Sequence, residues 1–378
     1  MKNIIVLGAG MVGSVIAGDL AEQHHTTLAD KAPEALEKAG AKYPKLTTIA
    51  LDVTDKTALQ NSIKKFDLVV CAVPGFLGFQ TLKWIIGAGM NVVDISFFPE
   101  NSLELDQLAK DNNVTAIVDC GVAPGMDNII LGYYNEQLEV SDFECLVGGL
   151  PKVKKWPFYY KAPFSPVDVI EEYTRPARYV ENGKMVVREA LSDCEHVVFE
   201  GVGTLEAFNS DGLRSIIYTM SHIPNMKEKT LRYPGHSTYI KALRESGFFN
   251  TEKIEVNGNP VSPLDFTSKI LFNEWKLEEG EEEITVMRVT IKGKNAEGKS
   301  TKVVYNLYDE YCTKTKTASM SRTTGYTAAA AANLFIEGLF DRKGVFPPEL
   351  VGKYEPCFRF FMDYLAARGV VFHKKQTT

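Results

Sequence analysis

A glycine-rich turn near the N-terminus lies between an apolar run and a stretch of small residues with helical spacing. The β-branched run Ile4–Leu7 leads into Gly8-Ala-Gly10-Met-Val-Gly13, and a second short run ends at Asp30. In a βαβ unit the first glycine permits a tight turn, the second lets backbone approach a pyrophosphate, and the third lets the helix pack closely on the strand. The helix N-terminus also offers free N–H groups to phosphate. This spacing predicts a dinucleotide site.

The acidic residue after the second run indicates which dinucleotide binds. Asp30 lies 22 residues after Gly8, where a carboxylate can accept hydrogen bonds from a ribose 2′-OH. A 2′-phosphate would meet like charge there, although Lys31 offsets part of that repulsion. We therefore expect NAD, with NADP as the alternative. The residues expected to contact the cofactor are Gly8, Gly10, Met11, Val12, Gly13, Asp30, Lys31, Asp52, Val53, Ala72, Val73, Pro74, Gly121 and Val122.

Composition limits the classes of partner. A chain of 378 residues with 45% hydrophobic and 24% charged residues can form two globular domains. Its net charge of -6 argues against nucleic acid or an anionic membrane as a partner. We find no signal-peptide pattern or apolar run long enough to span a bilayer, and the six scattered cysteines form no C-x-x-C pair. These features predict a cytoplasmic protein with no bound metal and a small-molecule partner; a homo-oligomer, in the form of a dimer, is also expected.

The pattern of strands and helices changes along the chain. Continuous apolar strands alternate with helices through the first 120 residues, which is typical of a doubly wound parallel sheet with both faces covered. Later segments alternate apolar and polar residues around turns such as Asn182-Gly183, which is typical of antiparallel hairpins. We predict an α/β fold: a Rossmann domain over residues 1–125, an inserted α+β substrate and dimerisation domain over 126–320, and C-terminal helices over 321–378 that return to the Rossmann domain.

Two local features complete this prediction. The Ala-rich segment from Thr327 is strongly helical, and Thr323, Thr324 and Gly325 are expected to precede it, with the threonines as N-caps or anion contacts. The acidic run at 278–283 is expected to be a solvated loop.

Several segments in order resemble the saccharopine dehydrogenase-like family, and within it the lysine 6-dehydrogenases most closely. The matching segments are GAGMVG, LDVTD, VDISF, CGVAPGMDN, VGGLP, FSPVDVIEEYTRPA, DGLRS, LRYPGH and MSRTTGY, and together they cover nearly the whole chain. The resemblance implies a Rossmann domain, an inserted substrate domain, and amine or imine chemistry with a nicotinamide cofactor.

Two positions differ from the saccharopine reductases of that family. Those enzymes carry Asp before the proline of the CGVAPG segment and an Arg near YPGH, whereas this chain has Ala123 and His236 at the corresponding places. We therefore expect a less charged pocket. Desolvating three carboxylates without an arginine would cost several kcal/mol, so lysine fits better than saccharopine.

Oxidation of an amine requires a neutral nitrogen and an environment that tolerates a cation. The candidate bases are His236, Tyr160 and Lys161, and Asp94 or Asp119 could stabilise the cation. Arg214 and Arg322 are the candidates for carboxylate binding, because a guanidinium matches a carboxylate with two bonds, and Thr323 is a further candidate substrate contact. Each of these residues also has a purely structural interpretation, such as a turn, a core edge, a cap or an internal ion pair.

Three functions remain open from the sequence. The first is NAD-dependent oxidation of the ε-amine of lysine. The second is a saccharopine-type or carboxynorspermidine-type reductase that joins an amine and an aldehyde. The third is a catalytically idle protein that binds NAD as a sensor or scaffold.

Overall fold

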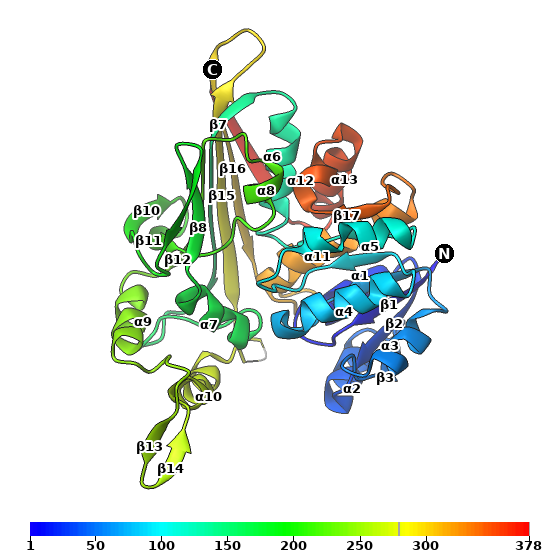
Figure 1. The fold of residues 1–378 in the computed structure, drawn as a ribbon, viewed down its shortest axis with the longest axis horizontal. Coiled ribbons are helices and arrows are strands. Elements are labelled where there is room, and N and C mark those ends of the chain that lie inside the picture. Colours follow the sequence, from blue (N-terminus) through cyan, green and yellow to red (C-terminus); the bar gives the residue numbers. More distant parts are fainter. Residues whose placement is uncertain (279, 378) are drawn as a thin grey trace.

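The computed structural model describes residues 1–278 and 280–377. Six strands from the N-terminal part and one from near the C-terminus form a seven-stranded parallel sheet. The strand order is β17-β6-β5-β4-β1-β2-β3, so the direction of winding reverses beside β1. This is the doubly wound sheet predicted from the sequence (Figure 1). The strands are β1 (Asn3–Leu7), β2 (His25–Asp30), β3 (Thr47–Ala50), β4 (Leu68–Cys71), β5 (Val92–Asp94), β6 (Thr115–Ile117) and β17 (Gly344–Phe346).

Alternate residues of β1 enter different cores, as expected for a strand buried on both faces. Ile4 and Val6 pack with one cluster of apolar side chains, and Ile5 and Leu7 pack with another. Helices α1 (Gly13–Leu20), α2 (Pro33–Lys42) and α11 (Ser319–Ile336) contribute to the first cluster; α3 (Lys56–Ile63), α4 (Gly75–Gly87) and α5 (Asp106–Asp111), which follows a short 3-10 turn (Ser102–Leu105), contribute to the second.

A second, nine-stranded mixed sheet forms the other main layer. Long strand β7 (Glu139–Pro151) pairs antiparallel with β15 (Glu283–Lys294) and parallel with β12 (Asn225–Arg232). The predicted hairpin at Asn182-Gly183 joins β8 (Ala177–Glu181) to β9 (Lys184–Arg188), and a second hairpin joins β15 to β16 (Ser300–Glu310). The remaining strands are β10 (Glu195–Phe199), β11 (Gly203–Asn209) and β18 (Phe372–Thr377).

Helices join the two sheets. In Figure 1, α6 (Met126–Asn135), α12 (Pro348–Gly352) and α13 (Glu355–Ala366) lie beside the long sheet, and α11 lies between them and the Rossmann layer. The last segment of the chain contributes to both sheets, because β17 pairs with β6 and β18 pairs with β16.

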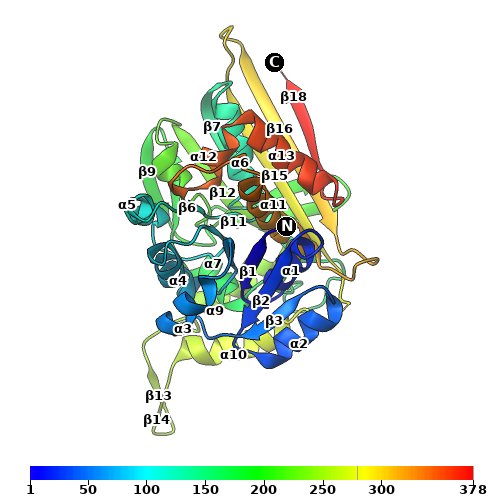
Figure 2. The same ribbon diagram turned by 90° about the vertical axis from the view of Figure 1, so that its right-hand side faces the viewer.

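A smaller lobe covers one end of the second sheet. It comprises α7 (Pro166–Thr174), α9 (His236–Glu245) and α10 (Pro263–Trp275), and an aromatic cluster around Trp275 fills its core. The short helix α8 (Ile216–Thr219) instead packs in the main core beside α12. The hairpin β13 (Ile254–Val256) and β14 (Asn259–Val261) projects from this lobe in both views (Figure 2). None of the helices among the described residues is sufficiently long and apolar to cross a bilayer.

Two local predictions were wrong. Helix α11 begins at Ser319, so Thr323, Thr324 and Gly325 lie inside the helix rather than before it. The acidic run is also not wholly solvated: Glu283 is 1% exposed, and its carboxylate accepts the backbone N–H groups of Ser319 and Met320 at 2.8 Å. Glu279 of that run lies outside the described residues. The carboxylate of Glu283 therefore caps the helix whose start the local pattern missed.

Candidate active site

A cavity of about 470 Å³ lies where the carboxyl ends of the Rossmann strands face the second domain. One side is formed by the glycine turn, by Asp30 and by the residues that follow β4, β5 and β6. The other side is formed by β7, α7, β12 and the loop at 210–212. The cavity therefore includes the crevice at which doubly wound sheets bind ligands.

The glycine turn has the shape that a dinucleotide needs. Gly8 has φ of +105°, and a Cβ on it would collide with the carbonyl group of Ala72. A Cβ on Gly13 would collide with the carbonyl group of Gly8, whereas a Cβ on Gly10 would meet no atom within 4 Å. The first and third glycines are thus required for the turn and its packing, and the second leaves open space beside the backbone.

The carboxylate of Asp30 is held beside this turn. Its Oδ2 accepts the backbone N–H of Ala9 at 2.7 Å, and its Oδ1 accepts that of Ala32 at 2.8 Å. Each oxygen has further lone-pair capacity for a ribose hydroxyl. The residues present therefore fit a nicotinamide dinucleotide, with Gly10 at the phosphates and Asp30 at the adenosine ribose.

The structure brings most of the predicted cofactor residues into this one cavity. Three do not line it: Lys31, Asp52 and Val53. The carboxylate of Asp52 is instead bonded to the backbone and hydroxyl of Thr54, which lower its pKa. Those that line the cavity are Gly8, Gly10, Met11, Val12, Gly13, Asp30, Ala72, Val73, Pro74, Gly121 and Val122.

His236, the first candidate base, lies outside the cavity. Its ring is fully buried, with Nε2 2.9 Å from the Tyr173 hydroxyl and Nδ1 2.9 Å from the Phe158 carbonyl oxygen. Burial, helped by the positive charge of Arg232, lowers the pKa of His236 to about 3. The expectation of a titrating His236 at the substrate is therefore wrong, because both ring nitrogens are occupied and the imidazole stays neutral.

Three other candidates are also placed away from the substrate space. The Tyr160 hydroxyl lies 3.4 Å from Arg232 in the aromatic core, and the Lys161 ammonium donates to the Glu274 carbonyl oxygen. Asp94 is buried at the end of β5, where it accepts bonds from the backbone and hydroxyl of Ser96, and burial raises its pKa to about 7. Only the neighbours of Asp94, Ile95 and Ser96, line the cavity.

The two arginines expected to bind a carboxylate already have internal partners. Arg214 is buried, pairs with Asp119 at 2.9 Å and donates to the Phe98 carbonyl oxygen; Asp119 itself lines the cavity. Arg322 pairs with Asp309 at 3.1 Å, away from the cavity. The Thr323 hydroxyl donates within helix α11, to the carbonyl oxygens of Ser319 and Met320. These three side chains therefore have structural partners in place of a substrate.

The cavity contains charged residues that were not singled out from the sequence. They belong to α7, β12 and the intervening loop: Asp168, Glu171, Glu172, Arg175, Asp211, Glu228 and Arg232. Five of these residues lie in two of the segments that carry the family resemblance, FSPVDVIEEYTRPA and LRYPGH. The resemblance was therefore the feature of the sequence from which they could have been predicted. The expectation of a weakly charged pocket without arginine is wrong, because Arg232 and Arg175 both line it.

Comparison with known proteins agrees with the fold. The saccharopine dehydrogenase NADP binding domain matches residues 4–117, and the saccharopine dehydrogenase C-terminal domain matches residues 121–370. The structure is similar to apo saccharopine dehydrogenase (L-Glu forming) from Saccharomyces cerevisiae, with a TM-score of 0.80, 19% identity and full coverage of both chains.

Curated relatives have similar sequences and differ in length and name. The mitochondrial alpha-aminoadipic semialdehyde synthase of Mus musculus is 24% identical over the whole of this chain, which spans only 48% of that relative. The carboxyaminopropylagmatine dehydrogenase of Synechocystis sp. is 23% identical over 92% of both chains. With both family domains matched in order over nearly its full length, the chain belongs to the saccharopine dehydrogenase family of oxidoreductases and has that family's NADP-binding type of Rossmann domain.

Proposed function

We propose that this protein oxidises an amine-bearing carbon of an amino acid with NAD(P), and that the ε-amine of lysine is its preferred target. When bound, the nicotinamide supplies the hydride acceptor. The glycine turn and Asp30 hold the nucleotide end, so the side of the cavity formed by the second domain remains for the substrate. The position of Asp30 supports NAD over NADP.

The observation that carries this proposal is an unpartnered guanidinium nitrogen in a cavity whose carboxyl groups outnumber its arginines. Arg175 pairs through Nη2 with Glu171 at 3.0 Å, and its Nη1 is buried without a hydrogen-bond partner in the part of the chain that the structure describes. The guanidinium carbon lies 5.1 Å from the ring centroid of Phe97. A substrate carboxylate would satisfy this donor.

The remaining charges favour a cation. Three cavity acids are matched by arginines: Glu172 with Arg232 at 2.7 Å, Asp211 with Arg178 at 2.8 Å, and Asp119 with Arg214. Asp168 and Glu228 have no ion pair among the described residues. A cavity with two uncompensated carboxyl groups attracts an ammonium group.

Lysine matches this arrangement better than a tricarboxylate. It brings one carboxylate for Arg175 and two ammonium groups for the acidic side. Saccharopine would bring three carboxylates to a cavity in which Arg232 is already bonded to Glu172, Tyr173 and the Leu231 carbonyl oxygen. Desolvating the unmatched carboxylates costs several kcal/mol, by the order of magnitude for unpaired buried charge.

A second candidate is a reductase that joins an amine and an aldehyde. The names of the mouse and Synechocystis relatives, together with Arg232 on the cavity wall, support it. The decisive experiment is a panel of amines and amino acids with NAD⁺ or NADP⁺, monitored for reduced nicotinamide. Lysine should give the highest kcat/KM. Turnover of saccharopine above that of lysine would contradict the proposal and favour the second candidate, and binding of NAD without any reduction would indicate a sensor.

The homodimer also stays a prediction. Light scattering on the purified full chain measures it directly, and a monomer at micromolar concentration would contradict it.

A further inference from the structure

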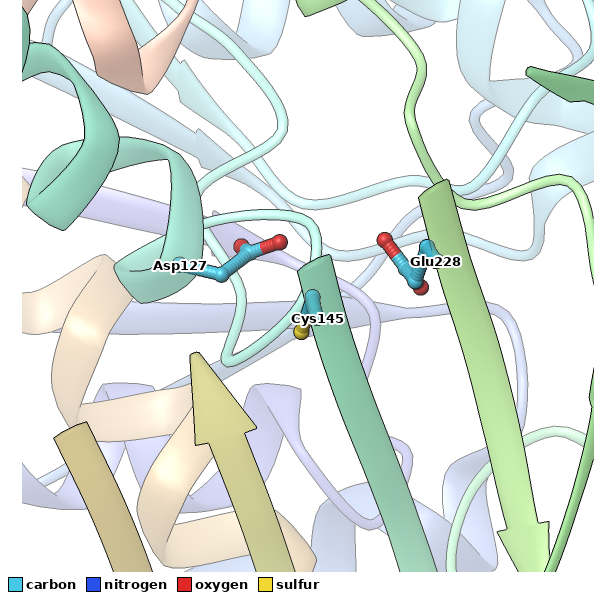
Figure 3. Close-up of side chains that lie close together, drawn as sticks. All are labelled: Asp127, Cys145 and Glu228. Atoms are coloured by element: carbon cyan, nitrogen blue, oxygen red, sulfur yellow. The ribbon is translucent and has the colours of Figure 1, made fainter. Parts of the chain in front are cut away.

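A cluster of three ionisable side chains lies in the wall of the cavity. Glu228 on β12 is the register partner of Cys145 on β7, so both side chains project from the same face of the sheet. Asp127, in the first turn of α6, faces them (Figure 3). One carboxylate oxygen of each acid and the thiol sulfur all lie within 4.8 Å of one another. The pairing of β7 with β12 thus brings together two residues that are 83 positions apart in the chain.

Each acid has one oxygen without a partner. Asp127 Oδ2 and Glu228 Oε2 are buried and accept no hydrogen bond from any described residue. The other oxygen of Asp127 accepts the backbone N–H of Gly125 at 2.9 Å. Of the three residues only Glu228 lines the cavity, so it connects the substrate space to the two groups behind it.

The surroundings leave the cluster short of positive charge. The charged and titratable groups that face it from neighbouring elements are Glu172, Asp211, Arg214, Glu349 and Glu144. Arg214, the one cation in this set, is already paired with Asp119. Burial, reinforced by these like charges, raises the pKa of Asp127 to about 7 and that of Glu228 well above its ordinary value. Ionising both acids together is unfavourable, so the pair retains one proton and one negative charge near neutral pH.

We propose that Glu228 accepts the proton that an ammonium substrate loses before its carbon is oxidised, while Asp127 holds the proton already present in the pair. This inference rests on the proposed function. An ammonium group against Glu228 favours the ionised form of that residue and moves the retained proton to Asp127. The N–H bond of the ammonium then breaks, an O–H bond forms on Glu228, and the amine keeps the electron pair.

The proton balance of the reaction is consistent with this role. The neutral amine carbon loses a hydride to the nicotinamide, and the resulting iminium ion is hydrolysed by water to an aldehyde and ammonium. Overall, one proton is released for each amine oxidised, and it is the proton that Glu228 received. No metal ion or further reactant is needed.

The test compares pH profiles of the full-length enzyme. Glu228→Gln is nearly isosteric and should lower kcat/KM for lysine by about 10²- to 10³-fold at neutral pH. The defect should shrink toward about pH 10, where the amine deprotonates unaided. Asp127→Asn should move the acidic limb of the profile to higher pH, because Glu228 can no longer pass its proton to Asp127. Glu181→Gln, on β8 and paired with Arg188 away from the cavity and the cluster, is the control and should behave like wild type.

A second readout does not depend on turnover. Infrared difference spectra of the enzyme without substrate, recorded from about pH 6 to about pH 10, should contain a titrating protonated-carboxyl band. The band should disappear in Glu228→Gln and shift in Asp127→Asn. Loss of this band in Glu228→Gln and its shift in Asp127→Asn, with the control unchanged, would support the proton pair even if no amine in the panel were oxidised. That last result would contradict only the proposed function.

Two results would overturn the inference while leaving the proposed function intact. The first is a Glu228→Gln enzyme whose lysine profile and infrared band are unchanged. The second is stoichiometric zinc in the purified protein that is lost in Cys145→Ser, since that would identify the cluster as a metal site.

Discussion

The carboxylate of Asp30 accepts a hydrogen bond from the glycine turn and lines the cavity, at the place where we propose that the adenosine ribose binds. Replacing Asp30 with Ser shortens the side chain and removes its charge, so the repulsion of a 2′-phosphate disappears while two hydrogen bonds to the ribose are lost. We expect the preference for NAD⁺ over NADP⁺, measured as the ratio of the two kcat/KM values, to fall by about tenfold or more. Glu37→Gln, an exposed carboxylate on α2, is the control. An unchanged ratio in Asp30→Ser would contradict the assignment of this residue.

Two arginines near the cavity should respond differently to the same change. Arg175→Ala removes a donor that is free for substrate, so kcat/KM for lysine should fall by about 10- to 150-fold, corresponding to about 1.5–3 kcal/mol for a charged hydrogen bond. The melting temperature should change little, because the ion pair of Arg175 with the half-exposed Glu171 is worth little. Steady-state kinetics with several lysine analogues would show the loss only for analogues that keep the carboxylate.

Arg214→Ala, by contrast, leaves a buried carboxylate unpaired. Both partners of the Arg214–Asp119 pair are 3% exposed, so the free energy of unfolding should fall by about 3–5 kcal/mol. Urea unfolding measures this loss. If Arg214→Ala unfolded at the wild-type midpoint but bound lysine poorly, Arg214 would be a substrate ligand after all.

These residues show how far the sequence alone could lead. The glycines and Asp30 could be predicted because their roles depend on local spacing within one βαβ unit. Glu228 reaches the cavity because β12 pairs in parallel with β7, and Arg175 lines it at the end of α7. No local pattern reveals either placement. His236 was misjudged for a related reason: the turn before it suggested exposure, whereas an aromatic cluster from three distant segments buries it.

At the scale of elements, helix α11 depends on a carboxylate from another strand. Glu283, at the start of β15, accepts the N–H groups of Ser319 and Met320, and burial raises the pKa of Glu283 to about 7. The residues Ser319–Gly325 resemble a turn because serine, threonine and glycine are frequent there, and the tertiary cap overrides that local preference. The start of the helix was therefore not predictable, although its alanine-rich body was.

Glu283→Ala should lower the free energy of unfolding by about 1–3 kcal/mol, since two buried N–H groups lose their acceptor. The pH dependence follows from the raised pKa. Between the unfolded value near 4.5 and the folded value of about 7, the unfolded chain ionises this group more readily, so its contribution to stability declines as pH rises through that window. Glu283→Gln should remove this decline, measured by denaturant unfolding at several pH values. A wild-type slope retained in Glu283→Gln would assign the decline to other acids.

At the scale of the whole molecule, the two sheets are interwoven by the chain rather than joined by one linker. Beyond β16 the chain runs through α11 and contributes β17 to the first sheet. Its last strand, β18, then pairs within the second sheet. The alternation of strands and helices in the Rossmann layer was predictable from the spacing of hydrophobic residues along the chain. The return of β18 to the second sheet was not, because an exposed six-residue strand carries little apolar signal of its own.

This interweaving should make the unfolding of the two layers a single event. The core cluster that contains Ile4 and Val6 of β1 also contains Val289 and Ile291 of β15, so neither sheet keeps its packing when the other is lost. We expect one calorimetric transition, and NAD⁺ at about 100 times its Kd should move the whole transition upward by about 3–4 °C, because it stabilises only the folded state, by about 2.7 kcal/mol. An inert nucleotide such as CMP at the same concentration is the control. Two resolved transitions, of which NAD⁺ shifted only one, would contradict this expectation. They would show that the Rossmann layer unfolds independently of the second sheet, which forms the substrate side of the cavity.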